Sequence, residues 1–219
     1  MPVPLMRSHV RVVWPWRAAL CALVATVGLW AALEALAASA RPRVGLVFHD
    51  DACELWPGMA QQAGGALTPG ECRVIAQIVR SEVEEAFAGL RLDVTTDARA
   101  FWTVHIVPVI PARTRMLGAV GASVAMGPLG GRGMVGLSPL TVHALRYGSP
   151  ETSREELVAA IGRGVGRSAV HELAHQIAGG AIDGRDPTTY EYGSADRRAQ
   201  FYGTLRWGPV GDRLRDRLK

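Results

Sequence analysis

The sequence predicts an α+β (or α/β) fold, in which a small mixed twisted sheet packs on two main helices. Three observations support this prediction. Two long segments carry helix signals, several β-rich segments lie between them, and a glycine-rich stretch separates the last β-rich segment from the second helix. The chain has 219 residues, which is enough for one domain with a substantial core.

The strand signals are short runs rich in Val, Ile and other β-favouring residues. These runs cover residues 44–48, 92–96 and 102–110. A helix is predicted between the first two runs, because Thr68 can cap it, Pro69 fits its first position and Glu71 completes a capping box. This helix should extend to about Gly89.

Residues 118–136 form the glycine-rich stretch, with seven glycines and no acidic residue. Gly131, Gly133 and Gly136 match the spacing of a GxGxxG phosphate-binding loop. No clear strand leads into this pattern and Pro139 interrupts its exit, so the context argues against a phosphate site. The stretch is predicted to form turns and an irregular edge strand, with residues 134–137 returning as a strand.

The longest predicted helix covers about residues 152–178, after a short helical piece over about residues 138–146. Apolar residues recur along it every four positions, at Leu157, Ile161, Val165, Ala169, Leu173 and Ile177. Three glycines lie in its middle, at Gly162, Gly164 and Gly166. Their expected use is close packing of the helix against the sheet. Two further glycines, at residues 179–180, end the helix.

This helix contains an HExxH motif made by His171, Glu172 and His175. Histidines four residues apart lie on one helical face, so both imidazoles can reach one metal ion, and Glu172 can reach a water bound to it. Residues 168–177 carry no charge other than Glu172. A buried glutamate is rare unless it is paired or bound to something. The motif predicts a zinc site, with one Zn²⁺ per chain and Glu172 as general base.

The motif and its surroundings resemble those of zincin metallopeptidases, in particular the metzincin-like branch. The order of strand, helix, strands, edge strand and motif helix is similar over roughly residues 43–183. The metzincin motif continues as HExxHxxGxxH, or ends in Asp in the snapalysin type. Here Gly180 and Asp183 supply a Gly-x-x-Asp element displaced two residues downstream, and Ala181 occupies the family's third-ligand position. No methionine follows Met134, so the Met-turn of metzincins has no counterpart.

A catalytic zinc usually has three protein ligands and one open position, so the two histidines need a partner. Asp183 is the first choice, because a glycine turn shortly precedes it and a carboxylate oxygen is an acceptable zinc ligand. Asp186 is the second candidate and Glu191 the third. These alternatives stay open from the sequence alone.

Two tyrosines follow, Tyr190 and Tyr192, in an unusually aromatic part of the chain. Either could donate a hydrogen bond to the oxyanion formed during peptide hydrolysis. The alternative is that these aromatic residues pack a short C-terminal subdomain, with Ser194 capping a short helix.

The first forty residues have the pattern of an export signal. Arginines precede an apolar run over residues 18–33, and Ala38, Ser39 and Ala40 form an A-x-A cleavage site. Residues 1–40 are predicted to be a signal peptide or, as the alternative, a membrane anchor through residues 18–33. Residues 41–219 would then be a single catalytic domain outside the cytoplasm, whether secreted, periplasmic or anchored.

Two cysteines remain after this leader, Cys53 and Cys72. An even pair in an exported chain predicts one disulfide, although two separate thiols are the alternative. Among the other histidines, His105 is expected to be a hydrogen-bonded strand residue. His49, beside Asp50 and Asp51, fits either a metal ligand or a turn at the end of a strand.

The net charge of +4 comes from scattered arginines, so the sequence gives no case for nucleic acid as a partner. A peptide or protein substrate is expected instead. The predicted function is that of an exported zinc-dependent metallopeptidase. The alternative is a non-catalytic exported binding or structural domain, whose metal site is vestigial or structural.

Overall fold

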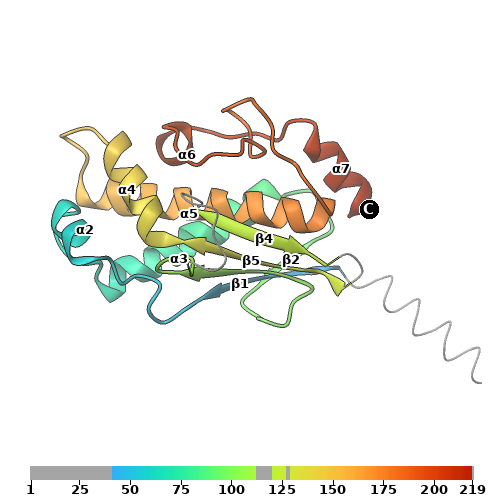
Figure 1. Cartoon of the computed structure of the whole chain (residues 1–219), viewed down its shortest axis with the longest axis horizontal. Helices are drawn as coiled ribbons and strands as arrows, with labels where there is room; N and C mark the ends of the chain where they lie inside the picture. The colour runs from blue at the N-terminus through green and yellow to red at the C-terminus, as the bar shows by residue number, and fades with distance from the viewer. Residues whose placement is uncertain (1–40, 112–119, 127–128, 219) are drawn as a thin grey trace, which may run out of the picture. The chain divides into compact units, whose positions relative to one another are not determined.

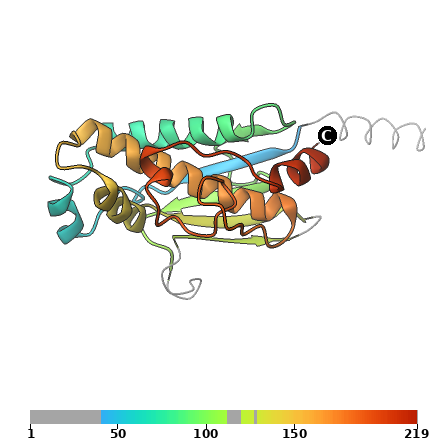
Figure 2. The same ribbon diagram turned by 90° about the horizontal axis from the view of Figure 1, so that it is seen from above.

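The computed structural model describes residues 41–111, 120–126 and 129–218. The predicted leader, residues 1–40, lies outside the described residues. The described chain has the expected α+β composition: a five-stranded mixed sheet with both long helices on one of its faces, as Figures 1 and 2 show. In the described part of the chain, no helix is both long enough and apolar enough to cross a membrane.

The sheet is parallel except at one edge. Its strands are β1 (Arg43–Phe48), β2 (Asp93–Thr95), β3 (Trp102–Val107), β4 (Gly121–Ala125) and β5 (Gly131–Gly136). They lie in the order β2-β1-β3-β5-β4. β4 is antiparallel to β5 and pairs Ser123 with Gly133, whereas the other neighbours are parallel. The irregular edge strand predicted from the glycine-rich stretch is therefore β4, at one edge of this sheet.

The helices connect and cover these strands. They are α2 (Pro57–Gln62), α3 (Pro69–Ala86), α4 (Leu137–Tyr147), α5 (Arg154–Ala178), α6 (Ala199–Tyr202) and α7 (Val210–Arg217). α5 is the central element, because it packs on the sheet through β3, β4 and β5, beside α3, and beneath α6 and α7 (Figures 1 and 2). A helix in this position can carry side chains to both the sheet edge and the C-terminal segment.

The apolar stripe predicted along α5 is confirmed, because its six members are at most 7% exposed. The helix is unbroken, but its three central glycines do not pack against the sheet. A methyl group at Gly162 would lie 2.8 Å from the Ile78 side chain on α3, and one at Gly164 would lie 2.2 Å from Phe201 on α6. The prediction that these glycines pack against the sheet was therefore wrong. They allow the neighbouring helices α3 and α6 to pack closely against α5.

The start of α3 follows the predicted capping box. Thr68 Oγ accepts the Glu71 N–H at 3.2 Å, and the Glu71 carboxylate accepts the Thr68 N–H at 2.8 Å. The helix ends at Ala86, three residues before the predicted Gly89. Gly89 has a positive φ of 81°, so it belongs to the turn that follows the helix and not to the helix itself.

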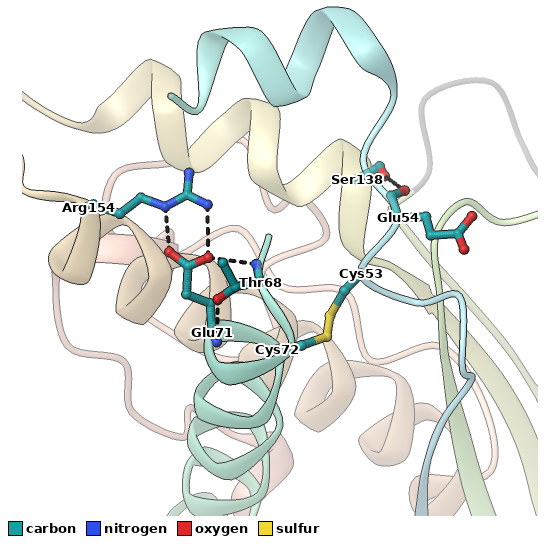
Figure 3. The surroundings of a disulfide bond; sticks show 7 residues. All are labelled: Cys53, Glu54, Thr68, Glu71, Cys72, Ser138 and Arg154. Carbon is teal, nitrogen blue, oxygen red and sulfur yellow. Dashed lines mark hydrogen bonds and ion pairs between the residues drawn. A yellow bond between two sulfur atoms is a disulfide. The ribbon is translucent and has the colours of Figure 1, made fainter. Parts of the chain in front are cut away.

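The predicted disulfide between Cys53 and Cys72 is present and joins the segment after β1 to the first turn of α3 (Figure 3). Next to it, the Arg154 guanidinium at the start of α5 contacts the Glu71 carboxylate at 2.6 and 3.0 Å. Arg154 also donates to the carbonyl of Ala66. One disulfide and one ion pair thus fix the beginnings of both long helices. A disulfide is compatible with an extracellular protein.

The C-terminal segment packs across α5 and reaches α3. The Trp207 ring lies 4.9 Å from the Tyr190 ring and 5.6 Å from the Phe87 ring, and its Nε1–H donates to the Ala86 carbonyl at 2.6 Å. Ser194 does not cap a helix as predicted. Its hydroxyl accepts the Asp196 N–H in a turn, and α6 begins only at Ala199.

Candidate metal centre

Three side chains converge near the end of α5. His171 Nε2 and His175 Nε2 are 3.1 Å apart, and Asp183 Oδ1 lies 3.4 Å from the first and 3.7 Å from the second. Within the described residues, this is the one group of three or more His, Cys, Asp or Glu side chains whose ligand atoms lie within 4.8 Å of one another. The structure therefore brings the two motif histidines together with Asp183, the first choice for a third ligand.

The other nitrogen of each histidine is held by a backbone carbonyl. His171 Nδ1 lies 2.7 Å from the Tyr190 oxygen, and His175 Nδ1 lies 3.0 Å from the Gly180 oxygen. A carbonyl oxygen can only accept, so each Nδ1 carries a hydrogen, and in the neutral form of each ring Nε2 presents a lone pair. Two lone pairs that face each other at 3.1 Å repel unless a cation lies between them. Two imidazoles and a carboxylate are a donor set that suits zinc.

The turn after α5 explains how the ligands come together. Gly179 ends the helix in the left-handed region at φ 72°, and its N–H donates to the His175 carbonyl. The chain then reverses, which brings the Gly180 carbonyl to the ring of His175 and Asp183 to both histidines. The glycine pair that was predicted to end the helix thus also positions the third ligand candidate.

Glu172 lies beside the histidines and is 7% exposed. Burial raises the pKa of its carboxyl, because desolvation penalises the charged form. Room for this side chain exists because β4 carries a glycine opposite it: a methyl group at Gly121 would lie 2.2 Å from Glu172 Oε1. The carboxyl group of Glu172 is therefore held between the motif helix and the edge strand.

One turn further along α5, Gln176 holds the helix to the sheet. Its amide donates to the Thr103 carbonyl at 3.1 Å. A methyl group at Gly131 would lie 2.6 Å from the Gln176 side chain, and one at Gly133 would lie 2.7 Å from its amide nitrogen. Gly131 and Gly133 thus let the motif helix approach β5 closely, and the three glycines of the GxGxxG spacing lie in this strand and not in a phosphate-binding loop.

The histidines and Glu172 line a cleft of about 710 Å³. Part of its lining is residues 120–123, at the start of the edge strand, and another part is residue 190 with residues 192–197 of the C-terminal segment. Ser168 and Gln200 also line this cleft. An exposed strand edge beside the three metal-ligand candidates gives an extended peptide a backbone with which to pair.

The two alternative third ligands have other partners. Asp186 accepts hydrogen bonds from the N–H and the hydroxyl of Thr188 and forms an ion pair with Arg206. Glu191 is 2% exposed, and its carboxylate accepts the N–H groups of Gly208 and Val210 near the start of α7. Neither belongs to the group that converges on the histidines.

Both candidate tyrosines line the cleft, with different surroundings. The Tyr190 ring packs on Trp207 and is 8% exposed, while its carbonyl orients His171. Tyr192 is half-buried, and the Arg197 guanidinium lies 5.0 Å from the centre of its ring. The position of Tyr192 leaves it the more accessible of the two from the cleft.

Several groups at this site could not be predicted from the sequence. The carbonyls of Tyr190 and Gly180 orient the two histidines, but they are backbone groups, and no side chain indicates this role. Arg197 is 9% exposed and donates to the carbonyl of Thr189 and to the side chain of Gln200. Burial lowers its pKa to about 10. Because the chain contains many arginines, the sequence does not single out Arg197 as the one that lines the cleft and holds neighbouring residues in place.

No protein-family model matches the sequence, and neither a curated protein nor a solved structure matches it.

Proposed function

We propose that this chain is an exported zinc-dependent metallopeptidase, in which His171, His175 and Asp183 hold the metal. The observation that carries the proposal is the convergence of these three ligand atoms in an open cleft beside a buried glutamate. A zinc ion bound there would polarise the scissile carbonyl and lower the pKa of a bound water. Three protein ligands leave a position open, as a catalytic site requires.

The chain's own residues would perform the proton transfers and hold the substrate. Glu172 would accept the proton of the attacking water and return it to the leaving amine. Burial raises the pKa of this carboxyl in the metal-free chain. The backbone of β4 would pair with an extended peptide, and the Tyr192 hydroxyl would donate to the developing oxyanion.

Replacement of the general base is the test of this proposal. Glu172→Gln keeps the shape of the side chain and removes its ability to accept a proton. We expect it to bind zinc as wild type does, and to hydrolyse a mixture of quenched fluorescent peptides about 10²–10⁴-fold more slowly. Zinc content after dialysis and the initial rate of hydrolysis are the two measurements.

Glu155→Gln is a matched control, because Glu155 lies in the first turn of the same helix and is exposed. It should leave the zinc content and the rate unchanged. If Glu172→Gln hydrolysed peptides as fast as wild type, the proposal would be wrong. A zinc-loaded wild type without any hydrolysis would favour the alternative of a non-catalytic binding domain.

A further inference from the structure

Two histidines that the proposed mechanism does not use meet on the other face of the sheet. His49 Nε2 lies 3.0 Å from His105 Nδ1, and the two rings are nearly perpendicular, with an interplanar angle of 71°. His49 directly follows β1, and its N–H continues the ladder by donating to the Ile106 carbonyl. His105 lies in the middle of β3. Adjacent strands thus hold the two imidazoles together.

This pair faces away from the proposed zinc centre. In β3, Val104 and Ile106 are fully buried in the core beneath the helices, and His105 alternates with them along the strand. Because successive side chains of a strand point to opposite faces, His105 lies on the face that α3 and α5 do not cover. His49 is exposed and His105 half-buried, so solvent and ions reach both.

Met134, on the neighbouring strand, is a third candidate ligand. β3 and β5 are parallel, and their register places Met134 directly beside His105. Residues paired in this way share a face of the sheet, and Met134 is half-buried like His105. The face therefore presents an exposed imidazole, a second imidazole and a thioether across three successive strands.

The spacing of the two nitrogens fits ligands of one metal ion. With metal–nitrogen distances of about 2.0–2.1 Å, neighbouring ligand atoms lie about 2.9 Å apart at a right angle and about 3.3 Å apart in a tetrahedron. The distance of 3.0 Å falls between these values and is close to the 3.1 Å between His171 and His175. Desolvation, followed by the charges of His49 and Arg132, lowers the pKa of His105, which favours its neutral imidazole.

We propose that His49, His105 and Met134 form a second metal site, separate from the cleft, which binds copper. Imidazole ligands suit both Cu²⁺ and Zn²⁺, but a thioether is a soft ligand and selects Cu⁺. The proposal does not depend on the peptidase function, because none of the three residues lines the cleft.

Copper binding to the untagged full-length chain tests this site. His171→Gln/His175→Gln first removes the other pair of histidines. We expect this double variant to bind one Cu²⁺ whose electron paramagnetic resonance spectrum shows two nitrogen ligands. Adding His49→Gln or His105→Gln should weaken that binding at least about tenfold. Adding His143→Gln should change nothing, because His143 lies in the cleft beside Asp196.

Wild type supplies an independent count if the double variant folds poorly. It should bind two Cu²⁺ per chain, and His105→Gln alone should bind one. Unchanged stoichiometry and affinity in both His49→Gln and His105→Gln would overturn the site. Met134→Leu should weaken Cu⁺ binding at least about tenfold in competition with bicinchoninate, while Cu²⁺ binding changes little. Unchanged Cu⁺ affinity in Met134→Leu would overturn the assignment to Cu⁺.

Discussion

Asp183 and Glu191 are carboxylates in one short segment, yet their surroundings differ. Asp183 is 57% exposed at its side chain and faces two histidine nitrogens. Glu191 is buried and satisfied by backbone N–H groups at the start of α7. A carboxylate near the N terminus of a helix is favoured by the helix dipole as well as by these hydrogen bonds. The two residues therefore have different expected roles: Asp183 belongs to the proposed zinc site, and Glu191 stabilises the fold.

Amide substitutions should separate these two roles. Glu191→Gln should lower the free energy of unfolding by about 1–3 kcal/mol, because it weakens charge-assisted hydrogen bonds in a buried position. Its zinc affinity should stay near that of wild type. Asp183→Asn should do the opposite, with zinc affinity at least about tenfold weaker and little loss of stability. Urea unfolding of the metal-free proteins and zinc competition assays measure the two quantities.

Asp186→Asn is the control for this comparison, since Asp186 pairs with Arg206 and Thr188 away from the histidines. It should keep the zinc affinity of wild type. A large loss of zinc affinity in Asp186→Asn or Glu191→Gln, with none in Asp183→Asn, would show that the third ligand has been assigned wrongly.

At the scale of elements, the contact of α5 with β4 and β5 decides where the motif residues lie. The glycines of these strands bring the sheet within reach of Glu172 and Gln176, with no side chain in between. Close packing of this kind tolerates added volume poorly. The same strand residues therefore determine the position of the catalytic candidate and part of the stability.

Gly131→Ala tests this contact. The added methyl group would lie 2.6 Å from the Gln176 side chain, so α5 or β5 must shift. We expect a loss of about 1–3 kcal/mol in the free energy of unfolding. Gly58→Ala is the control, because a methyl group there would meet no atom within 4 Å. Equal stabilities of the two variants in urea unfolding would contradict the proposed packing.

The ion pair between α3 and α5 should make stability depend on pH. The hydrogen bond from Arg154, helped by the Thr68 N–H, lowers the pKa of Glu71 from 4.5 to about 2. A depressed carboxyl pKa contributes stability above about pH 4.5, and this contribution is lost as the pH falls towards 2. Glu71→Gln should therefore be less stable than wild type at pH 6, with a difference that shrinks as the pH falls to 3.

Urea unfolding at pH 6, 5, 4 and 3 measures this difference. Glu155→Gln, at an exposed position of α5, should follow the wild-type curve over the same range. A constant difference between wild type and Glu71→Gln at all four pH values would show that the ion pair contributes no pH-dependent stability.

The elements with strong local signals were predicted well, and those set by distant partners were not. The capping box of α3 and the apolar stripe of α5 depend on residues within a few positions of one another. The local sequence is therefore sufficient to predict both. β5 begins at Gly131, three residues before the predicted strand. Glycine gives no local strand signal, and Gly131 and Gly133 leave room for the Gln176 side chain of α5, a partner far away in the sequence. The partners of Glu191 lie 17 and 19 residues away, beyond the reach of any local pattern.

For the whole molecule, the disulfide is the main covalent restraint on the described chain. It joins Cys53 to Cys72, which are 19 positions apart, and fixes the segment after β1 to the start of α3. Because a closed loop of this length reduces the freedom of the unfolded chain, Cys53→Ser/Cys72→Ser should lose about 3 kcal/mol of unfolding free energy. Urea unfolding under oxidising conditions measures the loss.

Reduced wild type serves as the control for that variant. Under strong reductant its stability should fall to that of Cys53→Ser/Cys72→Ser, whereas the variant should be insensitive to reductant. A reduced wild type as stable as the oxidised protein would contradict the expected contribution. The proposed zinc site should survive in the variant, since its ligands come from α5 and the turn after it.

The edge strand β4 has a consequence for the molecule in a concentrated solution. Within the described residues, no strand pairs with its outer side, and its Val124 side chain is 65% exposed. Free strand edges of this kind readily recruit the edges of other molecules. A second copy of the chain would dock where a peptide is expected to dock, and each copy would then obstruct the cleft of the other. For the proposed peptidase, self-association at high protein concentration would therefore compete with substrate binding at β4.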